Sequence, residues 1–163
     1  MRCVECDNNQ QLKEEQVTVR YQDCGLDNVI LYGVQHSRCE NCGEEYYGFG
    51  DLDRLHNLIA RIVISKKGPV NEKELRFLRK RLGYSGAMFA ERIGINPQTL
   101  SRYENGKLDI PRSIDIMLRS LVGNSLPDRA YDLHDILLNQ KGKAVKKIEL
   151  ESDGGEWSIR KAA

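Results

Sequence analysis

Four cysteines stand in two closely spaced pairs, Cys3 with Cys6 and Cys39 with Cys42. A gap of two residues lets both sulfurs of a pair point at one ion at about 2.3 Å, and two such pairs complete a tetrahedron of thiolates around zinc. Such a site has no open coordination position for a substrate. The spacing therefore predicts one structural Zn²⁺ per chain, and we expect the folding of residues 1–50 to depend on it.

A different metal and a different ligand are alternatives to this four-cysteine zinc site. A rubredoxin-like iron site also uses four cysteines, although the separation of roughly thirty residues between the pairs favours zinc. His36 lies near Cys39 and could replace a thiolate, but the four cysteines already complete a set. The fifth cysteine, Cys24, falls outside both pairs, and we interpret it as a bystander.

The segments between the cysteine pairs predict a small sheet. Residues 17–21 and 29–34 are rich in β-branched and aromatic side chains and are separated by turn-forming residues, which is typical of a hairpin. About fifty residues bury too little apolar surface to hold a fold alone, so the metal is needed. Apolar residues at helical spacing then predict an amphipathic helix over residues 51–64, and the run 65–69 marks a linker.

Three capping signals predict short helices in the next part of the chain. Asn71 begins a capping-box pattern with Glu74, Ser85 precedes a second helical run, and Asn96 precedes a third with Pro97 at its first position. A glycine closes each run, where helix ends favour it, and these are Gly83, Gly94 and Gly106. Short helices joined by tight turns result, and the stretch from Asn71 to Pro111 resembles a helix-turn-helix unit.

The rest of the chain predicts one more clear helix and an extension. After Pro111, helical spacing predicts an inner face made of Ile114, Met117, Leu118, Leu121 and Val122. Beyond residue 127 the pattern suggests a helix over 130–138 and a terminal hairpin over 145–160, whose role the sequence leaves open.

Together these elements predict an α+β fold in a chain of 163 residues, of which 40% are hydrophobic and 30% charged. We expect a zinc-stapled antiparallel β domain at 1–50 and a linker helix with its linker at 51–70. An all-α helix-turn-helix domain follows at 71–126, and a carboxy-terminal extension at 127–163. This composition suits a soluble protein of one or two small domains.

The helical part resembles the XRE family of phage-repressor-like helix-turn-helix proteins. The likeness rests on Leu78-Arg79, Ala90, Gly94, the run from Leu100 through Ser-Arg-Tyr-Glu-Asn to Gly106, and Pro111. With the amino-terminal CxxC…CxxC sheet, residues 1–122 look like the MqsA family of bacterial antitoxins. That resemblance implies a protein toxin as partner, a ribonuclease that cleaves mRNA.

In a helix-turn-helix, the first turns of the recognition helix enter the major groove, so its outward early positions face base edges. Here these positions are Gln98, Thr99 and Arg102, and the resemblance implies that Gln98 and Arg102 read bases. Gln pairs with adenine and Arg with guanine, each worth about 1–3 kcal/mol of discrimination. Leu100 and Tyr103 are expected to point inward as core residues.

Groups that flank this helix are expected to contact phosphates, which sets the register without reading sequence. They are Asn96, Asn105, Lys107 and Arg112; the alternative is a solvated basic face. Gly86 stands where many XRE proteins place Gln, which leaves only a backbone N–H for DNA at that position. The resemblance also implies a structural ion pair between Arg79 and Glu104.

Charge divides the chain. Residues 1–53 hold 4 basic and 11 acidic side chains, a net −7, residues 54–126 hold 14 and 6, a net +8, and the remainder is neutral. The middle segment has the sign expected of a module that binds phosphates. An acidic amino-terminal surface would steer toward a basic ribonuclease, although acidic faces are often only solubilising.

These observations predict a DNA-binding antitoxin and autorepressor of a type II toxin-antitoxin operon, acting as a homodimer on a double-stranded operator. The alternative is a freestanding zinc-containing XRE-family regulator without a toxin. An enzyme is not expected, because the chain shows no clustered His and carboxylate ligands and no open metal position. No stretch is long and apolar enough for a membrane, and no signal peptide is apparent, so we expect a cytoplasmic protein.

Overall fold

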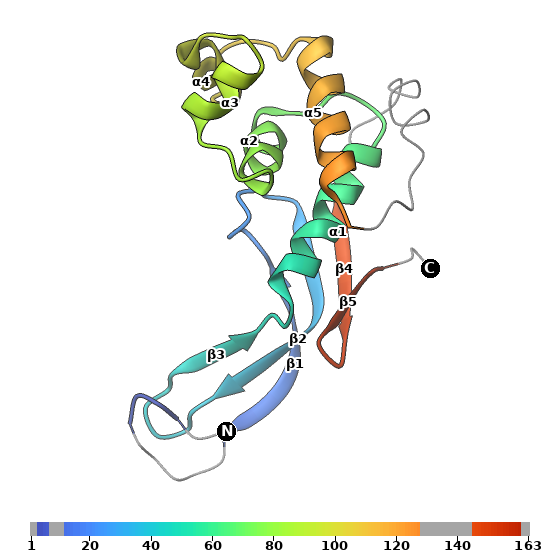
Figure 1. Ribbon diagram of the computed structural model, residues 1–163. Coiled ribbons are helices and arrows are strands. Elements are labelled where there is room, and N and C mark those ends of the chain that lie inside the picture. The colour runs from blue at the N-terminus through green and yellow to red at the C-terminus, as the bar shows by residue number, and fades with distance from the viewer. Residues whose placement is uncertain (1–2, 7–11, 128–144, 161–163) are drawn as a thin grey trace.

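The computed structural model describes residues 3–6, 12–127 and 145–160. Within them, strands β1 to β3 are followed by helices α1 to α5 and then by strands β4 and β5. In Figure 1, helices α2 to α5 lie at one end of the molecule, the sheet runs to the other end, and α1 lies between them. The fold is α+β, as the sequence predicts: a mainly antiparallel sheet that carries the cysteines, followed by a helical region.

Strand β2 (Val29–Arg38) is the centre of the sheet. On one side it pairs antiparallel with β1 (Lys13–Arg20), and the register shifts between Val17 and Val19. On its other side, the second half of β2 pairs antiparallel with β3 (Glu45–Gly48). The β-branched and aromatic runs therefore form the hairpin that their pattern predicts.

The first half of β2 pairs along the same edge with a strand from near the carboxy terminus. Strand β4 (Ile148–Asp153) pairs parallel with β2, and β5 (Glu156–Ile159) pairs antiparallel with β4. Gly33 lies where β2 changes partner from β4 to β3. It has φ +70°, and a Cβ there would stand 2.6 Å from the carbonyl oxygen of Ser152, so only glycine fits without strain.

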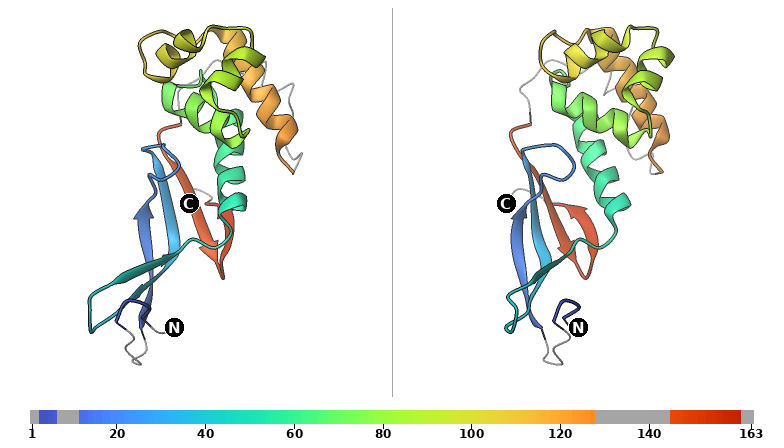
Figure 2. Two further views of the ribbon diagram at one scale, coloured as in Figure 1. Left: turned by 60° about the vertical axis from the view of Figure 1, so that its left-hand side comes forward. Right: turned by 90° about the vertical axis from the view of Figure 1, so that its left-hand side faces the viewer.

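The β4–β5 hairpin contributes core residues as well as strands. Trp157 is 1% exposed, and its indole N–H donates to the carbonyl of Phe49 at 2.6 Å. Helix α1 (Leu52–Ser65) contacts β5, and both views in Figure 2 show α1 beside this hairpin. The extension whose role the sequence leaves open thus completes the sheet. The helix predicted over 130–138 lies outside the described residues.

The helix starts follow from their caps. Asp51 accepts from the backbone N–H of Arg54 at the start of α1, and Asn71 and Glu74 form a full capping box on α2 (Glu72–Arg81). Ser85 caps α3 (Gly86–Arg92). Asn96 caps α4 (Pro97–Glu104), which has Pro97 at its first position.

Helix α5 (Arg112–Ser125) departs from the predicted inner face. Ile114, Leu118 and Val122 are buried, but Leu121 is 41% exposed. The helix instead buries a charged pair, Asp115 at 2% and Arg119 at 0% exposure. Apolar spacing alone misses such a pair, because buried ions are recognised only through partners elsewhere in the fold.

The described residues form two apolar clusters of different size. The larger one is continuous from the inner face of the sheet through α1 to the helices, and it includes Leu31, Ile59, Leu78 and Trp157. The smaller cluster lies at the cysteine end and centres on Cys3, Leu12 and Cys39. Most of the sheet therefore packs against α1 and the β4–β5 hairpin, which adds to the apolar surface that residues 1–50 bury by themselves.

Candidate metal centre and nucleic-acid interface

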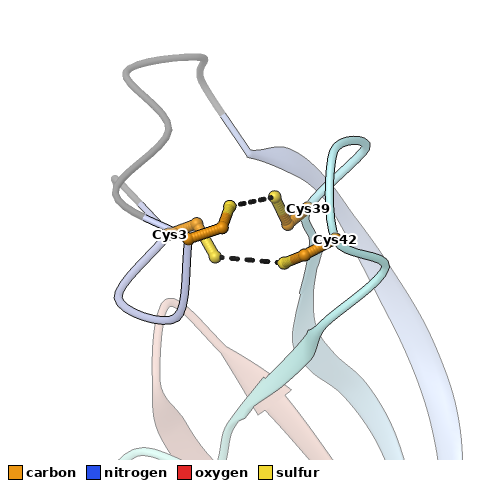
Figure 3. Close-up of side chains that lie close together, drawn as sticks. Cys3, Cys39 and Cys42 are labelled. Carbon is orange, nitrogen blue, oxygen red and sulfur yellow. Dashed lines mark hydrogen bonds between the residues drawn. The ribbon is translucent and has the colours of Figure 1, made fainter.

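The four predicted cysteines meet at the end of the sheet farthest from the helices. Cys3 and Cys6 lie on the segment before β1, and Cys39 and Cys42 lie in the turn between β2 and β3. All four sulfurs lie within 4.8 Å of one another, and Figure 3 shows Cys3 of the first segment facing Cys39 and Cys42 of the second. Distances of 3.5 Å from Cys3 to Cys42 and 3.7 Å from Cys6 to Cys39 are close to the edge of about 3.8 Å in a tetrahedron with Zn–S bonds of about 2.3 Å.

Backbone hydrogen bonds between residues close in sequence shape the turn that carries the second cysteine pair. The amide of Cys39 donates to the carbonyl of Glu44 at 2.9 Å, and the amide of Gly43 donates back to the carbonyl of Cys39 at 2.9 Å. Gly43 has φ +77°, which lets the chain turn tightly enough for both sulfurs to face the same point. The four cysteines are thus positioned to bind a metal ion.

Tyr46 is a member of this site that the cysteine spacing does not reveal. Its hydroxyl lies 3.4 Å from the Cys3 sulfur and also accepts from the amide of Val4 at 3.4 Å. This hydrogen bond is the main reason that the pKa of Cys3 is lowered to about 6, which favours the thiolate, the form that binds metal. Tyr46 lies on β3 directly after the cysteine turn, and the cysteine spacing gives no signal that its hydroxyl reaches Cys3.

His36, the alternative ligand, and Cys24, the expected bystander, both lie outside the sulfur cluster. The Nδ1 atom of His36 is 3.2 Å from a carboxylate oxygen of Glu15, and its ring packs against Tyr47 with centroids 4.8 Å apart. Cys24 lies in the β1–β2 loop beside a cavity of about 250 Å³ that His56 also lines. Burial raises the pKa of the Cys24 thiol, so it stays protonated at neutral pH. Neither residue joins the sulfur cluster.

The predicted base-reading side chains lie on the outward face of α4. Gln98 and Arg102 are exposed and one turn apart, and Thr99 is half-buried beside them. Leu100 is 1% exposed and anchors the opposite face of the helix in the main core. Asn96 accepts from the amide of Gln98 at 2.8 Å, which sets the start of the helix and hence the direction of its first turn.

Arg79 and Glu104 lie together, joining α2 to the end of α4. Arg79 Nε donates to one carboxylate oxygen of Glu104 at 2.6 Å and Nη2 to the other at 3.0 Å, while Nη1 donates to the carbonyl of Tyr84 at 2.6 Å. Both side chains are 9% exposed. A bidentate pair of this kind fixes orientation as well as distance, so it sets how α4 sits on the helical core.

Arg76, which the sequence pattern does not single out, holds the turn after α4. Its Nη2 donates to the carbonyl of Glu104 at 2.8 Å and to the side-chain oxygen of Asn105 at 2.9 Å. Asn105 in turn donates to the carbonyl of Ser101 at 2.6 Å. The amide of Asn105 is therefore engaged at both ends within the chain and serves as a cap for α4.

The remaining predicted phosphate ligands surround the two ends of α4. Asn96 is exposed at its amino-terminal end, and Lys107 is exposed just beyond its carboxy-terminal end. The amide of Lys107 donates to the carbonyl of Arg102 at 2.8 Å, which places the lysine next to the reading face. Arg112 is exposed at the first turn of α5, and Gly86 is the first residue of α3, as its cap requires.

Among the described helices, none is both long and apolar enough to cross a membrane.

Comparison with known proteins identifies the helical part of the chain. Residues 75–114, from α2 to the start of α5, match a family model described as Helix-turn-helix. No curated protein and no solved structure matches the chain. The match covers the caps Ser85 and Asn96, α4 and the Arg79–Glu104 pair, and it leaves the sheet and its cysteines outside. The helical region is therefore a DNA-binding helix-turn-helix domain of the XRE type, as found in transcriptional regulators.

Proposed function

We propose that this DNA-binding regulator is an antitoxin that binds and neutralises a protein toxin and represses the operon that encodes both. The observation that carries the proposal is the combination of a closed four-cysteine centre on an acidic amino-terminal region with a basic helix-turn-helix domain. The two regions have opposite charge and lie at opposite ends of the molecule (Figure 1), which suits two different partners.

Zinc is the metal that the cysteine cluster fits best. Four thiolates at tetrahedral separations are the ligand set of structural zinc, and the described site offers no fifth protein ligand. The ion would join the segment before β1 to the β2–β3 turn. Its role would be to hold the far end of the sheet together, not to carry out chemistry.

DNA recognition is assigned to α4. Gln98, Thr99 and Arg102 would face base edges in the major groove, while Asn96, Lys107 and Arg112 would contact phosphates. Asn105 would act mainly by ordering the turn that carries Lys107, because its own amide is already engaged. A single short recognition helix reads only a few base pairs, so we propose a homodimer on a palindromic double-stranded operator.

The toxin would bind the acidic amino-terminal region. Residues 1–53 carry a net charge of −7, and exposed carboxylates such as Glu14, Glu40 and Glu44 lie on strands and turns near the cysteine end. Ribonucleases that grip phosphates present basic surfaces, and opposite charges accelerate association and suppress wrong partners. A basic ribonuclease is therefore the toxin that this surface suits.

The alternative, a freestanding regulator without a toxin, is favoured by one specific observation. The sheet shares a continuous apolar core with α1 and the helices, so it has a structural role that needs no partner protein. In that case the metal and the sheet would serve stability alone.

Copurification separates the two proposals. We expect the tagged chain, isolated from its own source cells, to bring down a small basic protein in a fixed ratio, identified by mass spectrometry. Making that protein alone should arrest growth, and adding this chain should relieve the arrest even when Arg102 is replaced by Ala. A chain that is isolated alone, yet enriches one DNA sequence from a random pool, would instead support the freestanding regulator.

A further inference from the structure

We infer that the sheet and the DNA-binding helices form one rigid body, because buried polar contacts fix the segment that joins α1 to α2. This segment, residues 66–71, is the connecting segment. Its composition predicts a linker, and a linker would let the cysteine end of the sheet swing relative to α4. This rigidity would be a property of the chain itself, with or without a toxin.

The connecting segment buries alternate residues. Along the chain from the end of α1, Ile64, Lys66, Gly68 and Val70 are buried, while the residues between them, Ser65, Lys67 and Pro69, are exposed. Gly68 has φ +92°, so the backbone bends here, yet every second residue still lies against the core. A solvated flexible linker would show no such pattern.

Arg119 of α5 binds three alternate carbonyls of this stretch. Its Nη1 donates to the carbonyls of Ile64 at 2.7 Å and Lys66 at 3.0 Å, and its Nη2 donates to the carbonyl of Gly68 at 2.7 Å. Its Nε donates to Asp115 at 2.6 Å, and the side chain is 0% exposed. The three carbonyls converge on the planar guanidinium, which has enough donors to bind them all at once.

The side chain of Lys66 fixes the same segment to α2. Its ammonium donates to Glu74 at 2.5 Å, with the two side chains 2% and 5% exposed. The same carboxylate oxygen accepts from the amide of Asn71 at 2.8 Å as part of the capping box. The segment is thus bound through its carbonyls by α5 and through its lysine by α2, so bending it would expose or orphan buried charges.

A second set of contacts crosses the same boundary through the β1–β2 loop. Asp27 of this loop pairs with Lys73 of α2. The hydroxyl of Tyr21 lies 3.0 Å from His56 of α1, whose ring meets the ring of Phe77 of α2 edge-on at 6.2 Å. A hinge at the connecting segment would have to break these contacts too. A partner bound at the cysteine end therefore stands in a fixed place relative to the reading helix.

Residual dipolar couplings of backbone amides in the full metal-loaded chain test whether the sheet and the helices keep one fixed relative orientation. The couplings of residues 12–50 and those of residues 72–125 are fitted to separate alignment tensors. We expect the two tensors to agree in size, and in orientation within the frame of the structure. The variants Arg119→Met and, independently, Lys66→Met with Glu74→Gln should give two different tensors, and the exposed Arg92→Met, which lies away from the boundary, should still give one.

Two different tensors in the unaltered chain would overturn the inference. One common tensor in both boundary variants would overturn the assignment of rigidity to these residues. Should Arg119→Met fail to fold, the variant that combines Lys66→Met with Glu74→Gln decides the second point. The amide side chain that replaces the carboxylate keeps an oxygen for the capping box, while the ion pair is lost.

Discussion

The helix-turn-helix domain and the sheet share one core, but their structures are specified by different kinds of interaction. Helices α2 to α4 each begin at a capping side chain a few residues from the contacts it supports, and each is followed by a glycine with positive φ. The sheet depends on strands far apart in sequence, since Tyr32 of β2 donates to Glu149 of β4 across 117 positions. One region is specified by local signals, and the other by long-range pairing together with a cysteine cluster positioned to bind a metal ion.

This difference predicts which part of the molecule each substitution disrupts. The largest expected effect is that of losing the metal. Replacing Cys39 by Ser should reduce the zinc content from one ion per chain to nearly none, because apparent binding energies of structural zinc reach about 10–16 kcal/mol and need all ligands. Amide signals should be lost at the small cysteine cluster and kept in α2 to α5, since the main core does not include that cluster.

Metal analysis and amide spectra check this, with Cys24→Ser as the matched control that keeps the ion. Global unfolding of the Cys39→Ser chain would show that the main core depends on the cysteine cluster, contrary to the separation of the two clusters.

The second test compares one large aromatic side chain from each region. Trp157→Ala in the terminal hairpin and Phe89→Ala in α3 should each lower the free energy of unfolding by about 3–5 kcal/mol, because both rings are fully buried in the same core. Urea titration followed by circular dichroism gives both values. A loss well under about 1 kcal/mol for Trp157→Ala would mean that the hairpin is an accessory, contrary to the shared core.

Within the helical region, the Arg79–Glu104 pair should behave as a buried ion pair. Arg79→Met alone should cost about 3–5 kcal/mol, because Glu104 is left buried with only the 3.5 Å contact to Arg76. Arg79→Met combined with Glu104→Leu should cost less than the single change. Denaturant unfolding of the single and double variants decides it, and additive losses would mean that the pair is not coupled.

The smallest expected effect comes from two glycine-to-alanine substitutions, whose comparison distinguishes the contribution of strand pairing from that of backbone strain. Gly25 and Gly33 both have positive φ, so an Ala at either costs about 1–2 kcal/mol for backbone conformation alone. At Gly25 the new methyl meets nothing within 4 Å, whereas at Gly33 it would stand 2.6 Å from Ser152. Gly33→Ala should therefore be clearly the more destabilising, and equal losses would show that β4 does not pack on β2 as described.

The same contrast between local signals and long-range contacts explains which features of the structure the sequence predicts. The caps Asn71, Ser85 and Asn96 predict their helices correctly because capping acts within three residues. The four cysteines meet as predicted because their two-residue spacing is itself the signal. In both cases the physical cause lies within a short stretch of chain.

What could not be predicted depends on contacts between distant residues. Nothing in the residues around Gly33 names β4 as a partner, and Tyr46 reaches Cys3 only once the sheet has formed. Arg119 looks like a surface residue on a helical pattern until the carbonyls of Ile64, Lys66 and Gly68 are brought to it. The prediction that Leu121 faces inward is wrong for the same reason, because periodicity does not say which face meets a partner.

The central claim, that α4 reads DNA bases while its flanks hold phosphates, is tested most directly by a salt-dependent titration of two variants against a selected operator and random DNA. Arg102→Ala should lose about 1–3 kcal/mol per half-site on the operator and little on random DNA. Lys107→Ala should weaken binding to both and flatten the dependence on salt, because one phosphate contact fewer releases fewer counterions. Equal losses on operator and random DNA for Arg102→Ala would contradict the assignment of α4 as the reading helix.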